Sequence, residues 1–128
     1  MNNRIYNARN PAQGSRIRTL CCCSAGLLRS PTTAFVLARD FNRNTRAVGL
    51  EPSFALIPVE YTLMYWAQEI VVMTEDHVDT ILHLLQAEEL MRPVFCLNIP
   101  DIYEAYDPAL MDLINKAWQK REDLAVPF

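Results

Sequence analysis

The chain has 128 residues, a net charge of −3 at neutral pH and 51% apolar residues. This length and composition fit one α/β domain with a single sizeable core, which we expect to span residues 16–128 after a flexible N-terminal extension, residues 1–15. No apolar run approaches the roughly 18 residues needed to cross a bilayer, and the first residues lack the apolar block of a secretory signal. We therefore expect a cytoplasmic protein without a membrane partner.

The charge is unevenly distributed along the chain. Residues 1–46 contain eight arginines and a single acidic residue, Asp40, whereas the remainder is acidic. A basic segment of this kind attracts anions. Nucleic-acid binding is disfavoured, because the arginines are not interleaved with aromatic residues and the acidic remainder would repel a phosphate backbone.

The four cysteines predict neither a disulfide framework nor a metal site. Three are consecutive at positions 21–23, and Cys96 lies in a separate apolar run. Zinc sites usually need Cys-x2-Cys pairs or added histidines, and the two histidines of this chain, His77 and His83, stand apart from the cysteines. We expect reduced thiols, no metal and no other cofactor.

Strand-like and helix-like patterns alternate along the chain. Apolar runs that suit buried strands cover residues 17–22, 47–50, 69–73 and 93–97. Helical periodicity follows each run, beginning at Ser30, Val59, Glu75 and Pro108. Thr74 and Asp107 are expected to cap the last two helices. Four β-then-α units predict a four-stranded parallel sheet in a three-layer α/β/α fold.

Two polar segments fall at the carboxyl ends of predicted strands, where parallel sheets bind their ligands. One runs from Cys23 to Ser30, and the other covers residues 98–103. The backbone N–H groups of a loop that enters a helix can surround a phosphate, and small residues let the chain wrap closely. The loop residues predicted to bind phosphate are Ser24, Ala25, Gly26, Leu27 and Leu28.

Cys23 and Arg29 provide the reactive groups of this loop. The positive field of a helix N-terminus favours a thiolate over a thiol, so Cys23 is the predicted nucleophile. Arg29 can hold two phosphate oxygens with its planar guanidinium.

Cleavage of a phosphate ester also needs an acid for the leaving oxygen and a base for the water that follows. Asp101 and Asp107 are the candidates. Asp107 precedes Pro108 and is explained as a helix cap, so Asp101 is the predicted general acid.

The segment Cys23–Thr32 resembles the Cys-x5-Arg-Ser-Pro signature of the low-molecular-weight protein tyrosine phosphatases, in particular their short bacterial and phage-type relatives. The Asp101-Ile102-Tyr103 segment is similar to that family's Asp-Pro-aromatic acid loop, and the strand at 69–73 also matches. The resemblance covers most of the chain from Arg16 onward. A Cys-x5-Arg spacing alone is a weak pattern, but its position between a strand and a helix makes it specific.

The resemblance implies a metal-free, cysteine-dependent phosphomonoesterase that forms a phosphocysteine, with the strand order 2-1-3-4. Cys23 would be the nucleophile, Arg29 the phosphate-binding arginine and Asp101 the acid and base. Ser30 would support the thiolate, and Tyr103 would form a wall for an aromatic substrate. The partners implied are phosphorylated proteins or small aryl phosphates.

The sequence departs from the family in three places. The second and third positions after the nucleophile, commonly Gly and Asn, are Ala25 and Gly26, and Gly26 offers no side-chain hydrogen bonds. Ile102 replaces the proline after the acid, and the segment 50–67 is short. A phosphate- or phosphopeptide-binding module with little or no turnover therefore stays open. Arsenate reduction on the same fold is a further alternative, although only Cys96 lies downstream for a disulfide relay.

Cys21 and Cys22 are expected to be core residues of the first strand. Neighbouring strand residues point to opposite faces, and a disulfide between Cys22 and Cys23 would be strained. Core packing is therefore favoured over redox protection of the nucleophile.

Overall fold

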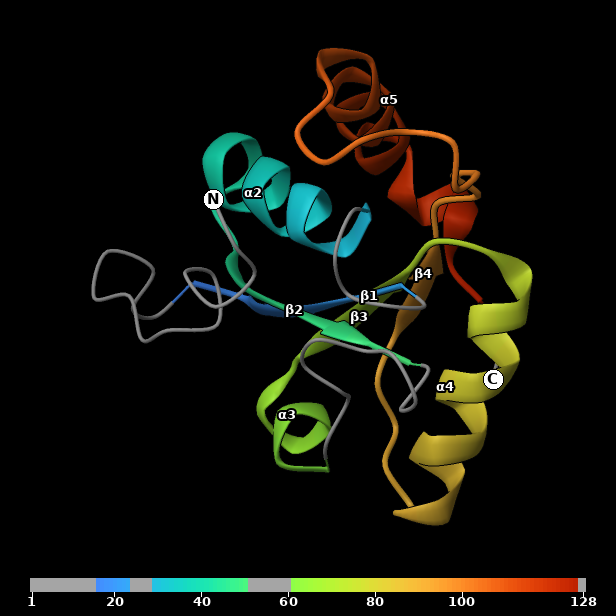
Figure 1. The fold of residues 1–128 in the computed structure, drawn as a ribbon. Helices are drawn as coiled ribbons and strands as arrows, with labels where there is room; N and C mark the ends of the chain where they lie inside the picture. The colour runs from blue at the N-terminus through green and yellow to red at the C-terminus, as the bar shows by residue number, and fades with distance from the viewer. Residues whose placement is uncertain (1–15, 24–28, 51–60, 127–128) are drawn as a thin grey trace.

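The computed structural model describes residues 16–23, 29–50 and 61–126 and places them in three layers (Figure 1). The expected extension, residues 1–15, lies outside the described residues. None of the described helices is long and apolar enough to cross a membrane. In chain order the elements are β1 (Arg18–Cys23), α2 (Arg29–Phe41), β2 (Asn44–Gly49), α3 (Tyr61–Trp66), β3 (Glu69–Val72), α4 (Glu75–Ala87), β4 (Val94–Cys96), α5 (Pro108–Gln119) and the short 3-10 helix η1 (Arg121–Leu124).

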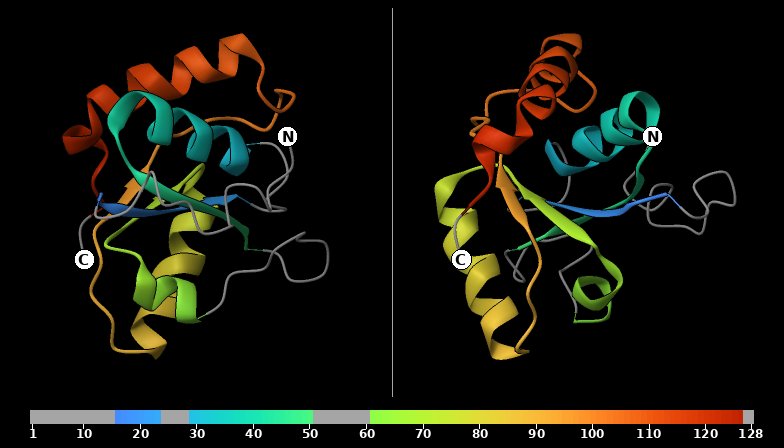
Figure 2. Two further views of the ribbon diagram at one scale, coloured as in Figure 1. Left: turned by 90° about the vertical axis from the view of Figure 1, so that its left-hand side faces the viewer. Right: turned by 180° about the vertical axis from the view of Figure 1, so that it is seen from behind.

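The four strands form one parallel sheet in the order β2-β1-β3-β4, which confirms the predicted fold class and strand order. Helices α2 and α5 cover one face of the sheet, and α3 and α4 cover the other, as Figure 1 and Figure 2 show. In the register of the sheet, Cys23 lies beside Gly49, and Cys22 lies beside Val72. The carboxyl ends of the strands therefore meet at one edge, where ligands bind in such sheets.

The strands are apolar along their length because both faces of the sheet are covered. Cys22 packs with the residues that face α3 and α4, whereas Cys21 and Cys23 pack with those that face α2 and α5. Cys21 and Cys22 are thus core residues of the first strand as predicted, and Cys22 and Cys23 lie on opposite faces as expected for neighbouring strand residues. Trp118 of α5 is fully buried in the core that faces α2 and α5, with its ring edge-on to Phe95 at a centroid distance of 5.3 Å.

Strand β2 is longer than predicted, because it begins at Asn44 rather than Ala47. Its additional residues are polar and are hydrogen-bonded to their surroundings. The backbone N–H of Asn44 donates to the carbonyl of Ile17 at 2.9 Å, and the hydroxyl of Thr45 donates to the carbonyl of Ala34 at 3.0 Å. Buried polar groups that find partners in this way are compatible with a strand but give no apolar pattern.

The two predicted helix caps have different outcomes. Asp107 caps α5 as predicted, since its Oδ1 accepts a hydrogen bond from the N–H of Ala109 at 2.8 Å. Thr74 occupies the N-cap position of α4, but its side chain makes no cap hydrogen bond. Its hydroxyl donates to the carboxylate of Asp76 instead, so Thr74 is the predicted N-cap residue but lacks the side-chain hydrogen bond expected of a cap.

A buried ionic network closes the opposite, amino edge of the sheet. The carboxylate of Glu69 accepts hydrogen bonds from the Thr19 hydroxyl at 2.7 Å and from Nε of Arg43 at 2.8 Å. The Arg43 guanidinium also lies over the Trp118 ring, 5.7 Å from its centroid. These contacts tie β1, β3 and α5 together at the edge remote from the predicted site.

Candidate active site

Cys23 ends β1 and is 3% exposed. Its thiol donates to Oγ of Ser30 at 3.1 Å, and the Ser30 hydroxyl donates to the carbonyl of Val48 at 3.3 Å. Ser30 is the second residue of α2, so these contacts join the end of a strand to the start of a helix. The structure thus brings the predicted nucleophile into contact with the hydroxyl predicted to support it.

Arg29 is the first residue of α2, one position earlier than predicted, and is only 4% exposed. Its Nη1 donates to the carbonyl of Ile99 at 2.9 Å, and its Nε lies 3.6 Å from Oδ1 of Asp101. Both partners belong to the segment that follows β4. One guanidinium therefore joins the two polar segments that the sequence places at the carboxyl edge.

The segment after β4 presents Asp101 to solvent, with 62% of its side chain exposed. The adjacent Ile102 is 76% exposed, and Tyr103 is partly buried against the core that faces α2 and α5. An exposed carboxyl group can exchange its proton with water while it stays close to Arg29. The role of Tyr103 as a substrate wall stays a prediction.

The predicted phosphate-binding loop lies outside the described residues, so the roles of its members stay predictions. Its two ends, Cys23 and Arg29, are described and both lie at the carboxyl edge. The loop residues concerned are Ser24, Ala25, Gly26, Leu27 and Leu28.

The remaining thiols lie in the interior. Cys21 and Cys22 are fully buried, and burial raises the pKa of both thiols well above their usual range. Burial also raises the pKa of Cys96, whose Sγ donates to Oδ1 of Asn98 at 3.3 Å. Cys96 packs in the core that faces α3 and α4, on the opposite side of the sheet from Cys23.

Sequence reasoning missed two groups near Arg29. The carbonyl of Ile99 is a backbone partner, which no side-chain pattern reveals. Asp76 lies in the first turn of α4, after β3. A hydrogen bond from Thr74 lowers the pKa of Asp76, and the positive charges of His77 and Arg29 act in the same direction. Its place at a helix start beyond a strand is the feature that could have identified it.

The comparisons with known proteins identify the fold. No protein-family model matches the sequence, and no curated protein matches it. Among solved structures, the tyrosine phosphatase Wzb from Escherichia coli K30, in complex with phosphate, matches with a TM-score of 0.60 and 18% identity, over 85% of this chain and 99% of that one. This chain has the fold of the low-molecular-weight tyrosine phosphatases.

Two further phosphatases share this fold. The tyrosine phosphatase AmsI of Erwinia amylovora matches with a TM-score of 0.56 and 15% identity, over 88% of this chain and 95% of that one. The YwlE arginine phosphatase, as a mutant with a phosphorylated active-site serine, matches with a TM-score of 0.50 and 18% identity, over 84% of this chain and 90% of that one. Identities this low establish the phosphatase fold alone.

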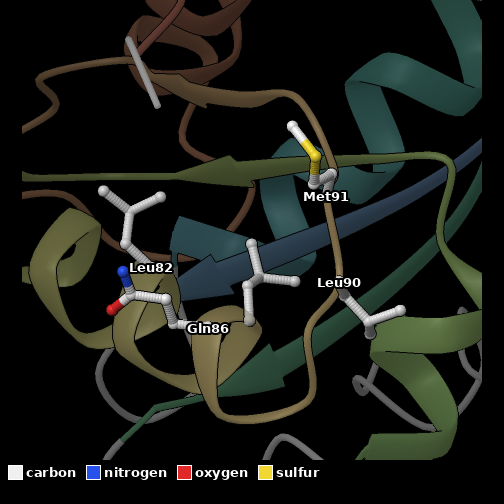
Figure 3. Close-up of a pocket in the computed structure, with 5 residues that line it drawn as sticks. Leu82, Gln86, Leu90 and Met91 are labelled. Carbon is white, nitrogen blue, oxygen red and sulfur yellow. The ribbon is translucent and has the colours of Figure 1, made fainter.

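An apolar groove lies apart from the predicted site of this phosphatase-like fold. It has a volume of about 350 Å³ and is formed by the second half of α4 and the segment that follows it (Figure 3). None of the predicted site residues lines the groove. The residues that line the groove are Leu82, Leu85, Gln86, Leu90 and Met91.

Among the described residues, no group of three or more His, Cys, Asp or Glu side chains could hold a metal ion.

Proposed function

We propose that the chain is a cysteine-dependent phosphomonoesterase of the tyrosine phosphatase type. The observation that carries this proposal is the position of Arg29, a buried guanidinium beside Asp101 at the edge of the sheet where Cys23 ends β1. Nucleophile, phosphate-binding group and proton donor then converge at the carboxyl edge of a sheet with the phosphatase fold. The shared fold supports this reading by analogy, and the residues themselves supply the chemistry.

In the first step, the Cys23 thiolate attacks the phosphorus atom, and the bond from phosphorus to the leaving oxygen breaks. The Ser30 hydroxyl, 3.1 Å from Sγ, can turn its proton toward the sulfur and stabilise the thiolate. Arg29 holds two of the non-bridging oxygens, and the loop amides hold the developing negative charge. The protonated Asp101 carboxyl group gives its proton to the leaving oxygen.

In the second step, water opens the phosphocysteine. The Asp101 carboxylate takes a proton from the attacking water, the sulfur–phosphorus bond breaks, and inorganic phosphate leaves. The thiolate and the protonated carboxyl group are restored, so the cycle balances without a metal or a cofactor.

The substrate class follows from the residues beside Asp101. The exposed side chain of Ile102 and the ring of Tyr103 offer apolar surface to an aromatic leaving group. We therefore propose phosphotyrosine in a protein, or a small aryl phosphate, as the substrate. The chemistry needs a reduced nucleophile, which fits the cytoplasm.

Arsenate reduction is disfavoured by the positions of the thiols. A relay would have to carry oxidation from Cys23 to another thiol, but Cys96 and Cys22 both pack on the other face of the sheet. Cys21 shares the face of Cys23, but it is two residues earlier on the same strand and fully buried.

The test is hydrolysis of p-nitrophenyl phosphate in the presence of a chelator. We expect turnover by the wild type, none by Cys23→Ser and turnover slowed by about 10²-fold or more by Asp101→Asn. A matched control is Cys96→Ser, at a buried thiol outside the site, which should keep its activity. An active Cys23→Ser variant would overturn the proposal, and phosphate binding without turnover would favour the binding module.

A further inference from the structure

The segment that carries Asp101 is attached to α2 at two points. At its start, the carbonyl of Ile99 accepts the 2.9 Å hydrogen bond from Arg29. At its end, the backbone N–H of Tyr106 donates to Oγ1 of Thr32 at 3.0 Å. Asp101 lies between these two attachments, so its position relative to α2 is set from both sides.

The attachments come from one stretch of the helix surface. Arg29, Thr32 and Phe35 follow one another at intervals of three residues, and residues three apart are neighbours on a helix. The ring of Phe35 meets the ring of Tyr106 edge-on, with a centroid distance of 5.6 Å. Thr32 is fully buried, so the acceptor of this hydrogen bond is shielded from water.

The conformation of Tyr106 is energetically unfavourable by itself. Its φ angle of 60° is in the left-handed region, which disfavours a bulky residue. Its hydroxyl oxygen is buried with no hydrogen-bond partner among the described residues. Such a conformation persists only where its surroundings hold it. The contacts with Thr32 and Phe35 are the ones that hold it here.

The contacts of Tyr106 compensate for the absence of a rigid residue after Asp101. Proline after the acid would restrict the backbone of this segment, but Ile102 occupies that position and is 76% exposed. The side chain of Ile102 therefore contributes little to the placement of the carboxylate. The rigidity has to come from the ends of the segment.

We propose that Thr32 is a positioning residue for the general acid, because its hydroxyl fixes Tyr106 and thereby the segment that holds Asp101 over the leaving oxygen. This inference rests on the proposed phosphatase function. It assigns a kinetic role to a buried threonine that touches neither the phosphate nor the leaving group.

The test compares leaving groups, because a misplaced acid affects only some of them. Phenyl phosphate releases a basic phenoxide that needs a proton, whereas 2,4-dinitrophenyl phosphate releases a stable anion. Thr32→Val keeps the branched shape and removes the acceptor for the Tyr106 N–H. We expect its kcat/KM to fall about three- to tenfold with phenyl phosphate, as for one lost hydrogen bond, and hardly at all with 2,4-dinitrophenyl phosphate. Thr32→Ser, which keeps the hydroxyl, should behave like the wild type.

The matched control is Thr45→Val. The Thr45 hydroxyl is also buried, and it donates a hydrogen bond to the carbonyl of Ala34 in α2, 3.0 Å away. Its loss should lower the melting temperature without any dependence on the leaving group. If Thr32→Val does not fold, Phe35→Leu tests the same attachment from a partly buried position, with the same leaving-group dependence expected.

Three results would overturn the positioning role. One is an equal loss of kcat/KM with both substrates, another is no loss with either substrate, and the third is a further loss with phenyl phosphate when Thr32→Val is added to Asp101→Asn, since a positioning residue has no effect once the acid is gone. If instead the wild type shows no turnover, the phosphatase proposal itself fails and this inference fails with it. Leaving-group dependence in Asp101→Asn but not in Thr32→Val would overturn the inference alone.

Discussion

Replacing Arg29 with lysine should destabilise the protein by about 2 kcal/mol. The side chain is 4% exposed, and its 2.9 Å hydrogen bond to the carbonyl of Ile99 is buried and charge-assisted, a kind that contributes about 1.5–3 kcal/mol. An ammonium group lacks the planar fork that reaches Ile99 and Asp101 together. The ion pair with Asp101 adds less, because that side chain is 62% exposed and exposed pairs contribute about 0–1 kcal/mol.

The assay compares melting temperatures and kinetics of Arg29→Lys and Asp101→Asn. At about 3–5 °C per kcal/mol for a chain of this length, Arg29→Lys should melt about 6–10 °C lower and Asp101→Asn within about 5 °C of the wild type. Both variants should lose kcat/KM with aryl phosphates, Arg29→Lys through phosphate binding and Asp101→Asn through proton transfer. An Arg29→Lys protein as stable as the wild type would refute the structural role of the Ile99 contact. An equal loss of stability in both variants would refute the argument that the hydrogen bond to Ile99 stabilises the protein more than the ion pair with Asp101 does.

Three further predictions concern stability, thiol reactivity and the pH dependence of unfolding. Glu69→Gln breaks the buried pair at the amino edge and should lower the unfolding free energy measured in urea by about 3 kcal/mol while kcat is unchanged; a matching fall in kcat would contradict this separation. Iodoacetamide at neutral pH should modify Cys23 in the native protein and spare Cys21 and Cys22, because burial raises the pKa of both thiols; modification of either before unfolding, detected by mass spectrometry, would count against it. Burial raises the pKa of Tyr106 in the folded state, so the stability linked to its proton is fully present below the unfolded pKa of about 10 and is lost as pH rises through the folded pKa. Tyr106→Phe should therefore lose less stability above pH 10 than the wild type. If the urea midpoints of the two proteins fall equally above pH 10, the raised pKa of Tyr106 is contradicted.

The sheet could be predicted because its strands are buried on both faces. Residues such as Ile70 and Val71 then form continuous apolar runs, which a local pattern detects. The start of β2 could not be predicted in this way. Asn44 and Thr45 are buried through hydrogen bonds to partners elsewhere in the chain, and the guanidinium of Arg46 lies 4.8 Å from the centroid of the Trp66 ring. Such partners become known only when the layers pack.

The same distinction holds for the candidate site. The spacing of Cys23 and Arg29 is local, so the strand-loop-helix pattern placed both at the carboxyl edge from sequence. The attachment of the segment that carries Asp101 to α2 is not local, because it joins Thr32 to Tyr106 across 74 positions of the chain. The Thr74 cap shows the converse case, because a nearby acceptor, Asp76, takes the hydroxyl that the local pattern assigned to the helix backbone.

The central claim is that phosphate passes through Cys23. Rapid acid quench of the wild type with a labelled aryl phosphate, followed by peptide mapping, should recover the label on Cys23 within the first turnover. Asp101→Asn should accumulate more labelled phosphocysteine where its hydrolysis by water becomes slow. Labelled phosphate released without any covalent protein label, or a label on another residue, would contradict the account.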